Sequence, residues 1–250
     1  MRRMIQCYLV LALWPAISLA TTGGVHIHHV DVDLADKASL QRGATTFVNY
    51  CMGCHSAAYM RYNRLGKDLG ISEKVLKTNF MFNPDNKVGD TMSIAMRKAD
   101  AKEVYFGVNP PDLSVIARSR GADWLYTYFL SFYKDDSRPT GVNNLVFREV
   151  GMPHVLWELQ GMQAPLYEDV RMHDGNKKKV ITELEQISEG TQSPEEYEQT
   201  VRDLVNFLVY LGEPAQLQRK KVGFWVLLYL IVILLPVCYL LKKEYWKDIH

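Results

Sequence analysis

Residues 51–55 read Cys-Met-Gly-Cys-His, and this pentapeptide constrains the chain more than any other segment. Cysteines at this spacing occur in zinc sites, redox dithiols and haem-attachment sites. A structural zinc site needs four ligands, and no second Cys pair or suitably spaced His pair is present. A redox dithiol usually belongs to a βαβ pattern, and none precedes Cys51. The histidine directly after Cys54 therefore favours haem, with Cys51 and Cys54 bound covalently and His55 ligating the iron.

The N-terminus has the pattern of a secretory signal peptide. Arg2 and Arg3 precede a short apolar run, which ends in the small residues Ser18 and Ala20. We expect residues 1–20 to be removed on export, and a retained membrane anchor is the alternative. Export agrees with haem attachment, because c-type haem is attached outside the cytoplasm.

A second apolar segment, residues 223–241, carries no charge over nineteen residues. At about 1.5 Å per residue a helix of this length spans roughly 28 Å, close to the thickness of a bilayer core. We expect a basic linker at 216–222, a transmembrane helix at 223–241 and a short cytoplasmic tail at 242–250. Basic residues flank both ends almost equally, so the signal peptide decides the orientation. The prediction is a single-pass protein of the inner (cytoplasmic) membrane with its body in the periplasm.

The four cysteines are Cys7, Cys51, Cys54 and Cys238. Cys7 lies in the predicted signal peptide and Cys238 in the predicted membrane span, so the exported body has no disulfide framework beyond the pair at 51 and 54. Of the 29 basic and 28 acidic residues, residues 21–218 hold 21 and 26, a net charge of −5. An acidic domain repels nucleic acid and attracts a basic partner.

Helical periodicity predicts a mainly α-helical domain over residues 21–215. Leu40, Ala44, Phe47 and Val48 form an apolar face directly before the Cys pair. A capping box at Ser193 opens a predicted helix over about 194–212, whose apolar stripe we expect to face the core. Its stripe comprises Tyr197, Val201, Leu204, Val205, Leu208 and Leu211. Residues 78–112 contain three prolines and lack strong periodicity, and we expect loop-rich insertions there.

The sixth ligand of the iron decides what such a haem does. A methionine suits electron transfer, whereas an open position suits catalysis or gas binding. Met152 and Met162 both follow glycine in loop-like sequence with proline downstream, and spacing alone does not separate them. The rival ligands are His26, His28, His29, His154 and His173.

The sequence resembles the cytochrome c1 family of the proteobacterial type, the haem subunit of ubiquinol–cytochrome c reductase. The resemblance covers nearly the whole chain after the signal peptide. It runs through DKASLQRGA, CMGCHSAAYMRYNRL, VGDTM, NPPDLSVIARSRG, RPTGVNN, GMPHVLWELQG and GMQAPLY, and ends in one C-terminal anchor.

This resemblance implies one covalent haem c on Cys51 and Cys54, with His55 as proximal ligand. The distal methionine of the family lies in a Gly-Met-x-Pro-Pro-like segment, which implies Met162 in GMQAPL; one of the two prolines is missing here and the other is displaced. Met152 is the alternative. The segment PPDLSVIARSR resembles the one in which Pro111 packs against the porphyrin and Arg120 pairs with a propionate, with Arg118 as the neighbouring alternative.

The implied mechanism is outer-sphere electron transfer from the Rieske iron–sulfur protein to a c-type cytochrome, with no substrate bond made or broken on this chain. Cytochrome b, a dimeric complex and membrane lipid around the C-terminal helix are the other implied partners. Six glutamates within residues 183–198 form either a docking site for a basic cytochrome or a solvated acidic loop. The rival functions are an exported haem peroxidase or similar enzyme, whose distal site opens for substrate, and a non-catalytic haem sensor or structural assembly subunit.

Overall fold

The computed structural model describes residues 25–94, 96, 98–105, 107–171, 177–245 and 247. The predicted signal peptide lies outside these residues, as does His173. The helices are α2 (Lys37–Thr46), α3 (Tyr62–Leu69), α4 (Glu73–Asn79), α5 (Lys98–Asp100), α6 (Ile116–Arg120), α7 (Ala122–Leu130), α8 (Trp157–Gln160), α9 (Pro194–Gly212), α10 (Gln216–Tyr229) and α11 (Leu235–Leu240). Four π-helical turns are η1 (Phe47–Cys51), η2 (Ala101–Tyr105), η3 (Leu230–Leu234) and η4 (Leu241–Tyr245).

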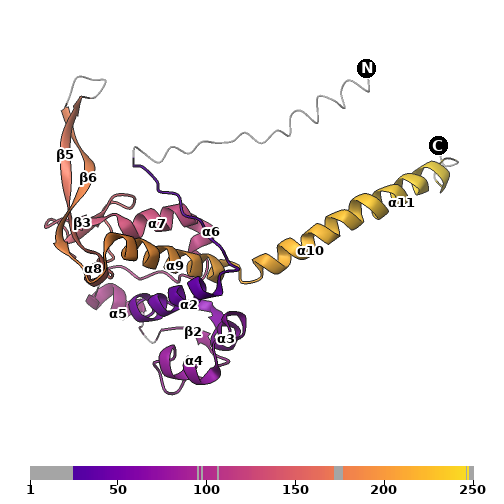
Figure 1. The fold of residues 1–250 in the computed structure, drawn as a ribbon, viewed down its shortest axis with the longest axis horizontal. Helices are drawn as coiled ribbons and strands as arrows, with labels where there is room; N and C mark the ends of the chain where they lie inside the picture. Colours follow the sequence, from indigo (N-terminus) through magenta and orange to yellow (C-terminus); the bar gives the residue numbers. More distant parts are fainter. Residues whose placement is uncertain are drawn as a thin grey trace.

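The described strands form three separate antiparallel pairs rather than one sheet. These pairs are β1 (Ala57–Arg61) with β2 (Thr91–Met92), β3 (Phe132–Lys134) with β4 (Val142–Asn144), and β5 (Gly161–Arg171) with β6 (Lys177–Glu189). Helices α2, α7 and α9 make up the body to which these pairs are attached (Figure 1). The expectation of a mainly α-helical domain is confirmed, and residues 78–112 contain only short elements.

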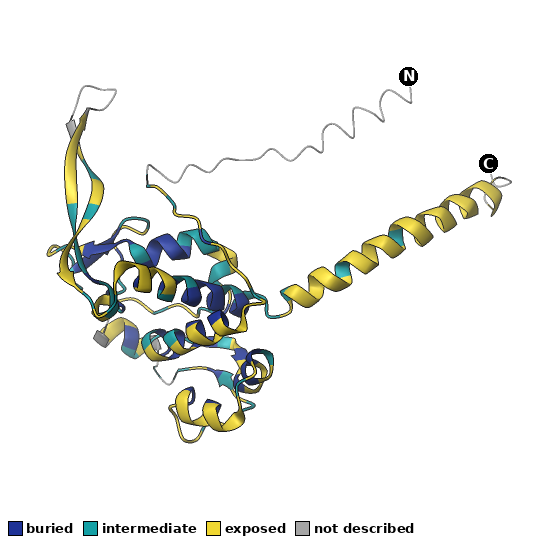
Figure 2. Ribbon diagram, in the orientation of Figure 1, coloured by how far each residue is buried: buried dark blue, intermediate teal, exposed yellow. Residues whose placement is uncertain are grey.

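Helix α9 is the centre of the core and is the helix predicted over 194–212. The Ser193 side chain accepts a hydrogen bond from the Glu196 amide, and the Glu196 carboxylate accepts one from the Ser193 amide. This capping box satisfies two amides that the first helical turn leaves without partners. All six residues of the predicted apolar stripe are buried, so the stripe faces the core rather than a partner (Figure 2).

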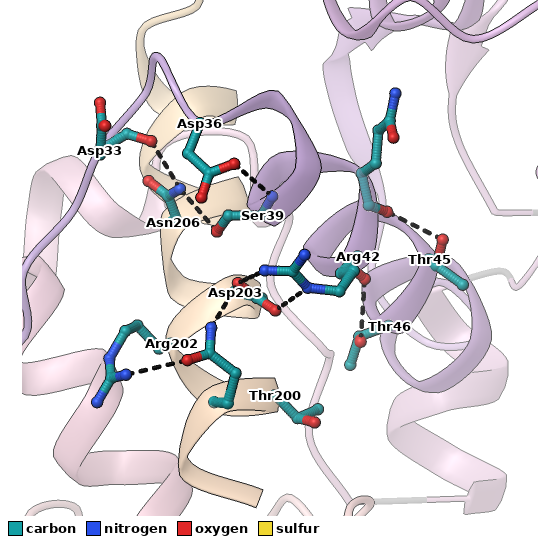
Figure 3. Close-up of polar contacts among 12 residues, drawn as sticks. Asp33, Asp36, Ser39, Arg42, Thr45, Thr46, Thr200, Arg202, Asp203 and Asn206 are labelled. Atoms are coloured by element: carbon teal, nitrogen blue, oxygen red, sulfur yellow. Dashed lines mark hydrogen bonds and ion pairs between the residues drawn. The ribbon is translucent and has the colours of Figure 1, made fainter. Parts of the chain in front are cut away.

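Helices α2 and α9 cross closely, because Gly43 lies against the backbone of α9. A Cβ at this position would collide with the Asp203 carbonyl oxygen. One residue earlier, Arg42 donates to Asp203 from both Nε (2.6 Å) and Nη2 (3.0 Å) (Figure 3). This crossing fixes α2, and with it η1, which carries Cys51, onto the core.

β5 and β6 form a long ribbon that projects from the helical body and is exposed over most of its length (Figures 1 and 2). Glu183, Glu185 and Glu189 lie on β6, whereas an acidic loop was one of the two alternatives for this stretch. Cross-strand backbone pairing from Gly161–Glu189 to Arg171–Lys177 accounts for the difference. The single-sequence pattern around these glutamates does not alternate clearly enough to predict that pairing.

The C-terminal helix runs from Gln216 to Tyr245 and is long and apolar enough to cross a membrane, with a mean hydropathy of 2.7 in its most apolar window. It extends away from the helical body (Figure 1). Pro236 does not interrupt it. The π-helical turn η3 precedes the proline, and there the Leu235 amide donates to the Leu230 carbonyl. Such a turn accommodates a residue that has no amide proton of its own.

Candidate haem site

A largely apolar cavity of about 440 Å³ lies beside the Cys-x-x-Cys-His segment. Cys51, Cys54 and His55 line one part of its wall, and residues 108–116 line another. The rest of the lining comes from Tyr50, α6, α7, α9 and residues 147–155. The cavity therefore gathers side chains from Tyr50 to Leu208, which are far apart in sequence.

A tight turn after η1 presents both cysteines and His55 to the cavity. The amides of Cys54 and His55 both donate to the Cys51 carbonyl, at 3.1 and 2.9 Å. Burial raises the pKa of the Cys51 thiol to about 12 and also raises that of Cys54. Zinc ligands and redox cysteines need accessible thiolates, which this environment disfavours. Among the described residues, no group of three or more His, Cys, Asp or Glu side chains is arranged to hold a metal ion.

The orientation of His55 follows from one hydrogen bond. Its Nδ1 lies 2.7 Å from the Pro111 carbonyl oxygen. A carbonyl only accepts, so Nδ1 carries the proton and Nε2 keeps its lone pair. Burial lowers the pKa of His55, which keeps the ring neutral near pH 7. A neutral histidine with its second nitrogen held by a carbonyl is the arrangement of a metal-ligating histidine.

Pro111 holds this position because its segment is tied to the residues after His55. The Leu113 amide donates to the Ser56 carbonyl at 2.8 Å. The Ala58 amide donates to the Asp112 carboxylate at 2.9 Å, and the Tyr59 amide donates to the Ser114 hydroxyl at 3.1 Å. Pro111 also lines the cavity, and its packing against a porphyrin stays a prediction. Its carbonyl also orients His55, which the sequence had not indicated.

Among the described methionines, Met152 is the one that lines the cavity. It follows Gly151 in the segment between β4 and α8, and its Sδ accepts a hydrogen bond from the Tyr128 hydroxyl at 3.4 Å. Tyr128 comes from α7 and stacks on Trp124, with ring centroids 5.1 Å apart. His55 and Met152 thus lie on the walls of one cavity.

Met162, the ligand expected from the resemblance, is not part of this lining. It lies at the start of β5, where it pairs with Ser188 of β6 and its amide donates to the Ser188 hydroxyl at 2.9 Å. The geometry therefore differs from the expectation. The residues after Gly161 are extended by strand pairing, so they do not form the loop that would bring Met162 to the cavity.

Of the two candidate arginines, Arg120 faces the cavity and Arg118 does not. The Arg120 guanidinium carbon lies 5.0 Å from the Trp124 ring centroid and 5.6 Å from that of Phe147. Arg118 instead lies 3.5 Å from the Glu213 carboxylate, which also pairs with Arg219. Arg120 is held by aromatic rings and remains available to a carboxylate inside the cavity.

Of the rival ligands, the four described histidines are not part of the cavity lining, and His173 lies outside the described residues. His26, His28 and His29 are on an exposed extended segment. His154 is buried against Phe132, with parallel rings 4.9 Å apart. The aromatic residues of the cavity wall were not among the site residues expected from the sequence. They include Tyr50, Trp124, Tyr128, Phe129 and Phe147, and the aromatic-rich stretch ADWLYTYFL was the available signal for three of them.

These side chains fit a covalently attached haem. The apolar wall suits a porphyrin, the paired thiols suit its vinyl groups, and a neutral histidine and a thioether are present as iron ligands. Comparison with known proteins gives the family. The family model described as "Cytochrome C1 family" matches residues 28–249. The chain belongs to the cytochrome c1 family.

Individual relatives support this membership. The chain is 51% identical to cytochrome c1 of Allochromatium vinosum over all of both chains. It is 28% identical to cytochrome c1 of Rhodospirillum rubrum, over 99% of this chain and 97% of that protein. It is also 49% identical to a protein of Nitrosomonas europaea named ammonia monooxygenase gamma subunit, over 99% of this chain and all of that one.

Proteins of the cytochrome c1 family carry one covalently attached haem c, and Cys51 and Cys54 match that attachment. They are membrane-anchored haem subunits of the cytochrome bc1 complex. The long C-terminal helix of this chain agrees with such an anchor.

Proposed function

We propose that this chain is a one-electron carrier whose haem is ligated by His55 and Met152, and that it passes electrons from the Rieske protein to a c-type cytochrome. The observation that carries the proposal is the presence of both side chains in the lining of one cavity. Haem bound there supplies a one-electron couple between ferric and ferrous iron. A ligand on each side leaves no coordination position for a substrate, which suits electron transfer and not catalysis.

The residues of this chain would hold the haem and set its reduction potential. The Pro111 carbonyl fixes the His55 ring with Nε2 free to bind, and the Tyr128 hydroxyl reaches the sulfur of Met152. The Arg120 guanidinium can pair with a haem propionate, because this positively charged side chain of α6 lines the cavity. The apolar lining excludes water and so disfavours the extra positive charge of ferric iron. This favours the reduced state and raises the reduction potential.

The protein's placement is part of the proposal. We propose a haem domain in the periplasm, one membrane span within 216–245 and a short cytoplasmic tail. The N-terminal signal pattern supports this orientation. Partners would be cytochrome b and the Rieske subunit of a dimeric bc1 complex, with membrane lipid around the span. Purification of the intact complex from membranes tests these partners. Recovery of monooxygenase subunits instead would favour the role in the name of the Nitrosomonas relative.

The ligand assignment is tested by replacing each methionine in the purified full-length holoprotein. Met152→Leu should abolish the methionine–iron charge-transfer band and allow carbon monoxide to bind the reduced protein, while haem stays covalently attached. Met162→Leu is the matched control, because it lies at the start of β5, outside the cavity, and should leave both properties unchanged. The reverse pattern would reassign the ligand to Met162. A wild-type protein that readily binds carbon monoxide would favour an enzyme or sensor.

A further inference from the structure

The segment that carries Met152 has no helix or strand of its own. Residues 145–152 connect β4 to the start of the α8 region, and Phe147, Glu149, Val150, Gly151 and Met152 all line the cavity. Glu149 has a φ of 59°, a left-handed conformation that is unfavourable for a non-glycine residue. A short irregular segment with a strained residue needs partners outside itself to keep one position.

Two consecutive buried asparagines at the end of β4 supply these partners. The Oδ1 of Asn144 accepts hydrogen bonds from the amides of Val146 (3.1 Å) and Phe147 (3.2 Å). The Oδ1 of Asn143 accepts from the amides of Asn144 and Glu149, both at 2.9 Å. Three amides of the segment, those of Val146, Phe147 and Glu149, are thus held by side-chain oxygens, and the Leu145 amide donates to the Ser131 carbonyl.

The asparagines are themselves anchored to the protein body. The Asn144 Nδ2 donates to the Tyr128 carbonyl at 2.7 Å. Tyr128 is also the residue whose hydroxyl donates to the Met152 sulfur. The Asn143 Nδ2 donates to Asp135 Oδ2 at 2.9 Å. Arg138 completes the arrangement by donating from Nη2 to the Glu149 carbonyl at 3.0 Å. Strained Glu149 is therefore held at both its amide and its carbonyl.

We propose that Asn143 and Asn144, from the RPTGVNN stretch, are positioning residues that hold segment 145–152 closed so that Met152 stays on the iron. This inference rests on the proposed assignment of Met152 as ligand. Without the two amide oxygens, the segment would populate conformations in which Met152 leaves the cavity. The sixth position would then open to an external ligand, while the covalent haem and His55 remain in place.

Carbon monoxide affinity of the reduced, purified full-length holoprotein measures that opening. Asn143→Ala should raise the affinity by about tenfold, equivalent to ~1.4 kcal/mol, and should weaken the methionine–iron band. Asn144→Ala should do the same. If Asn144→Ala, which alters a fully buried side chain, yields no haem-stained protein, Asn143→Ala decides the matter alone. Asn83→Ala is the control, because this exposed asparagine also caps a loop amide but lies outside the cavity lining.

An exchange of partners tests whether the hydrogen bonds themselves matter. The double variant Asn143→Asp with Asp135→Asn keeps the acceptor oxygen at 143 and reverses the donor and acceptor between the two positions. The net charge is unchanged, and Ser137 can still donate to the oxygen left at position 135. This variant should restore wild-type carbon monoxide affinity and the methionine–iron band. Loss of thermal stability alone would not produce this pattern.

The proposal fails if Asn143→Ala keeps the wild-type band and carbon monoxide affinity, or if the exchange variant behaves like Asn143→Ala. Met152→Leu separates this failure from that of the ligand assignment. If Met152→Leu keeps the methionine–iron band, the assignment of Met152 is wrong. If Met152→Leu loses the band and the asparagine variants keep it, only the positioning role is wrong.

Discussion

The Tyr128 hydroxyl donates a hydrogen bond to the Met152 sulfur at 3.4 Å. Tyr128 is buried, and burial raises the pKa of its hydroxyl, so the group stays protonated and remains a donor throughout the physiological pH range. A thioether that ligates iron uses one lone pair for the metal and has a second available to accept this hydrogen bond. Tyr128 therefore connects helix α7 directly to the proposed distal ligand.

Removal of this hydroxyl should lower the reduction potential. The hydrogen bond withdraws electron density from the sulfur and so weakens its donation to ferric iron, which favours the reduced state. Tyr128→Phe should keep the methionine–iron band and shift the potential downward by up to ~59 mV, which is a tenfold change in the one-electron equilibrium constant. Tyr126→Phe is the control, because the Tyr126 hydroxyl lies near Glu198 instead. Redox titration of both variants measures the shift, and equal shifts would contradict the prediction.

The two arginines of α6 should behave differently. Arg120 lines the cavity, whereas Arg118 pairs with Glu213. Loss of a cation beside the haem destabilises the more negative, reduced state, so Arg120→Gln should lower the potential by ~59 mV or less. Arg118→Gln should leave it unchanged. Redox titration of the two variants in the same buffer compares their potentials directly. A larger shift for Arg118→Gln would assign the propionate contact to Arg118 instead of Arg120.

The two residues of the ion pair between α2 and α9, Arg42 and Asp203, should differ in how much their replacement lowers the stability of the fold. The Asp203 side chain is 3% exposed and the Arg42 side chain 54%. Arg42→Met leaves a buried carboxylate with the Gln199 amide as a remaining partner, at an expected cost of about 2–3 kcal/mol. Asp203→Asn leaves a cation that water can reach, at about 1 kcal/mol. Denaturant unfolding of the detergent-solubilised holoprotein measures both, and a larger loss for Asp203→Asn would contradict this account.

The N-terminal segment should attach to α7 in a pH-dependent way. The His28 amide donates to the Thr127 hydroxyl, the Val30 amide donates to the Asp123 carboxylate, and the His29 ring lies 3.0 Å from that carboxylate. The hydrogen bond and charge of Asp123 raise the pKa of His29 above 6.5. The protonated ring therefore favours attachment, and its contribution is complete below pH 6.5 and is lost as the pH rises through the raised value.

Histidine titration by NMR on the reduced full-length protein measures that effect. His29 should titrate above 6.5 in the wild type and return towards its ordinary pKa in Asp123→Asn. Asp31→Asn should change the His29 titration less, since Asp31 contributes less to the shift than Asp123 does. A His29 titration that is unchanged in Asp123→Asn would show that the contact does not form in solution.

Features that depend on local sequence were predictable. Haem attachment follows from Cys51, Cys54 and His55 because the three groups lie within one turn of chain, where spacing alone brings them together. The extent of α9 follows from the capping box at Ser193 and from a continuous apolar stripe, both of which are local. The membrane helix follows from its length and hydropathy, which require no partner within the chain.

Features that depend on contacts between distant segments were decided only by the tertiary structure. Met152 and Met162 both follow glycine, so local sequence treats them alike. Pairing of β5 with β6 extends the backbone at Met162, whereas Asn143, Asn144 and Tyr128 hold the segment of Met152 at the cavity. Arg118 and Arg120 were likewise separated only by their contacts with Glu213 and Trp124. Helical or strand periodicity carries no information about such pairings, because each partner is specified elsewhere in the chain.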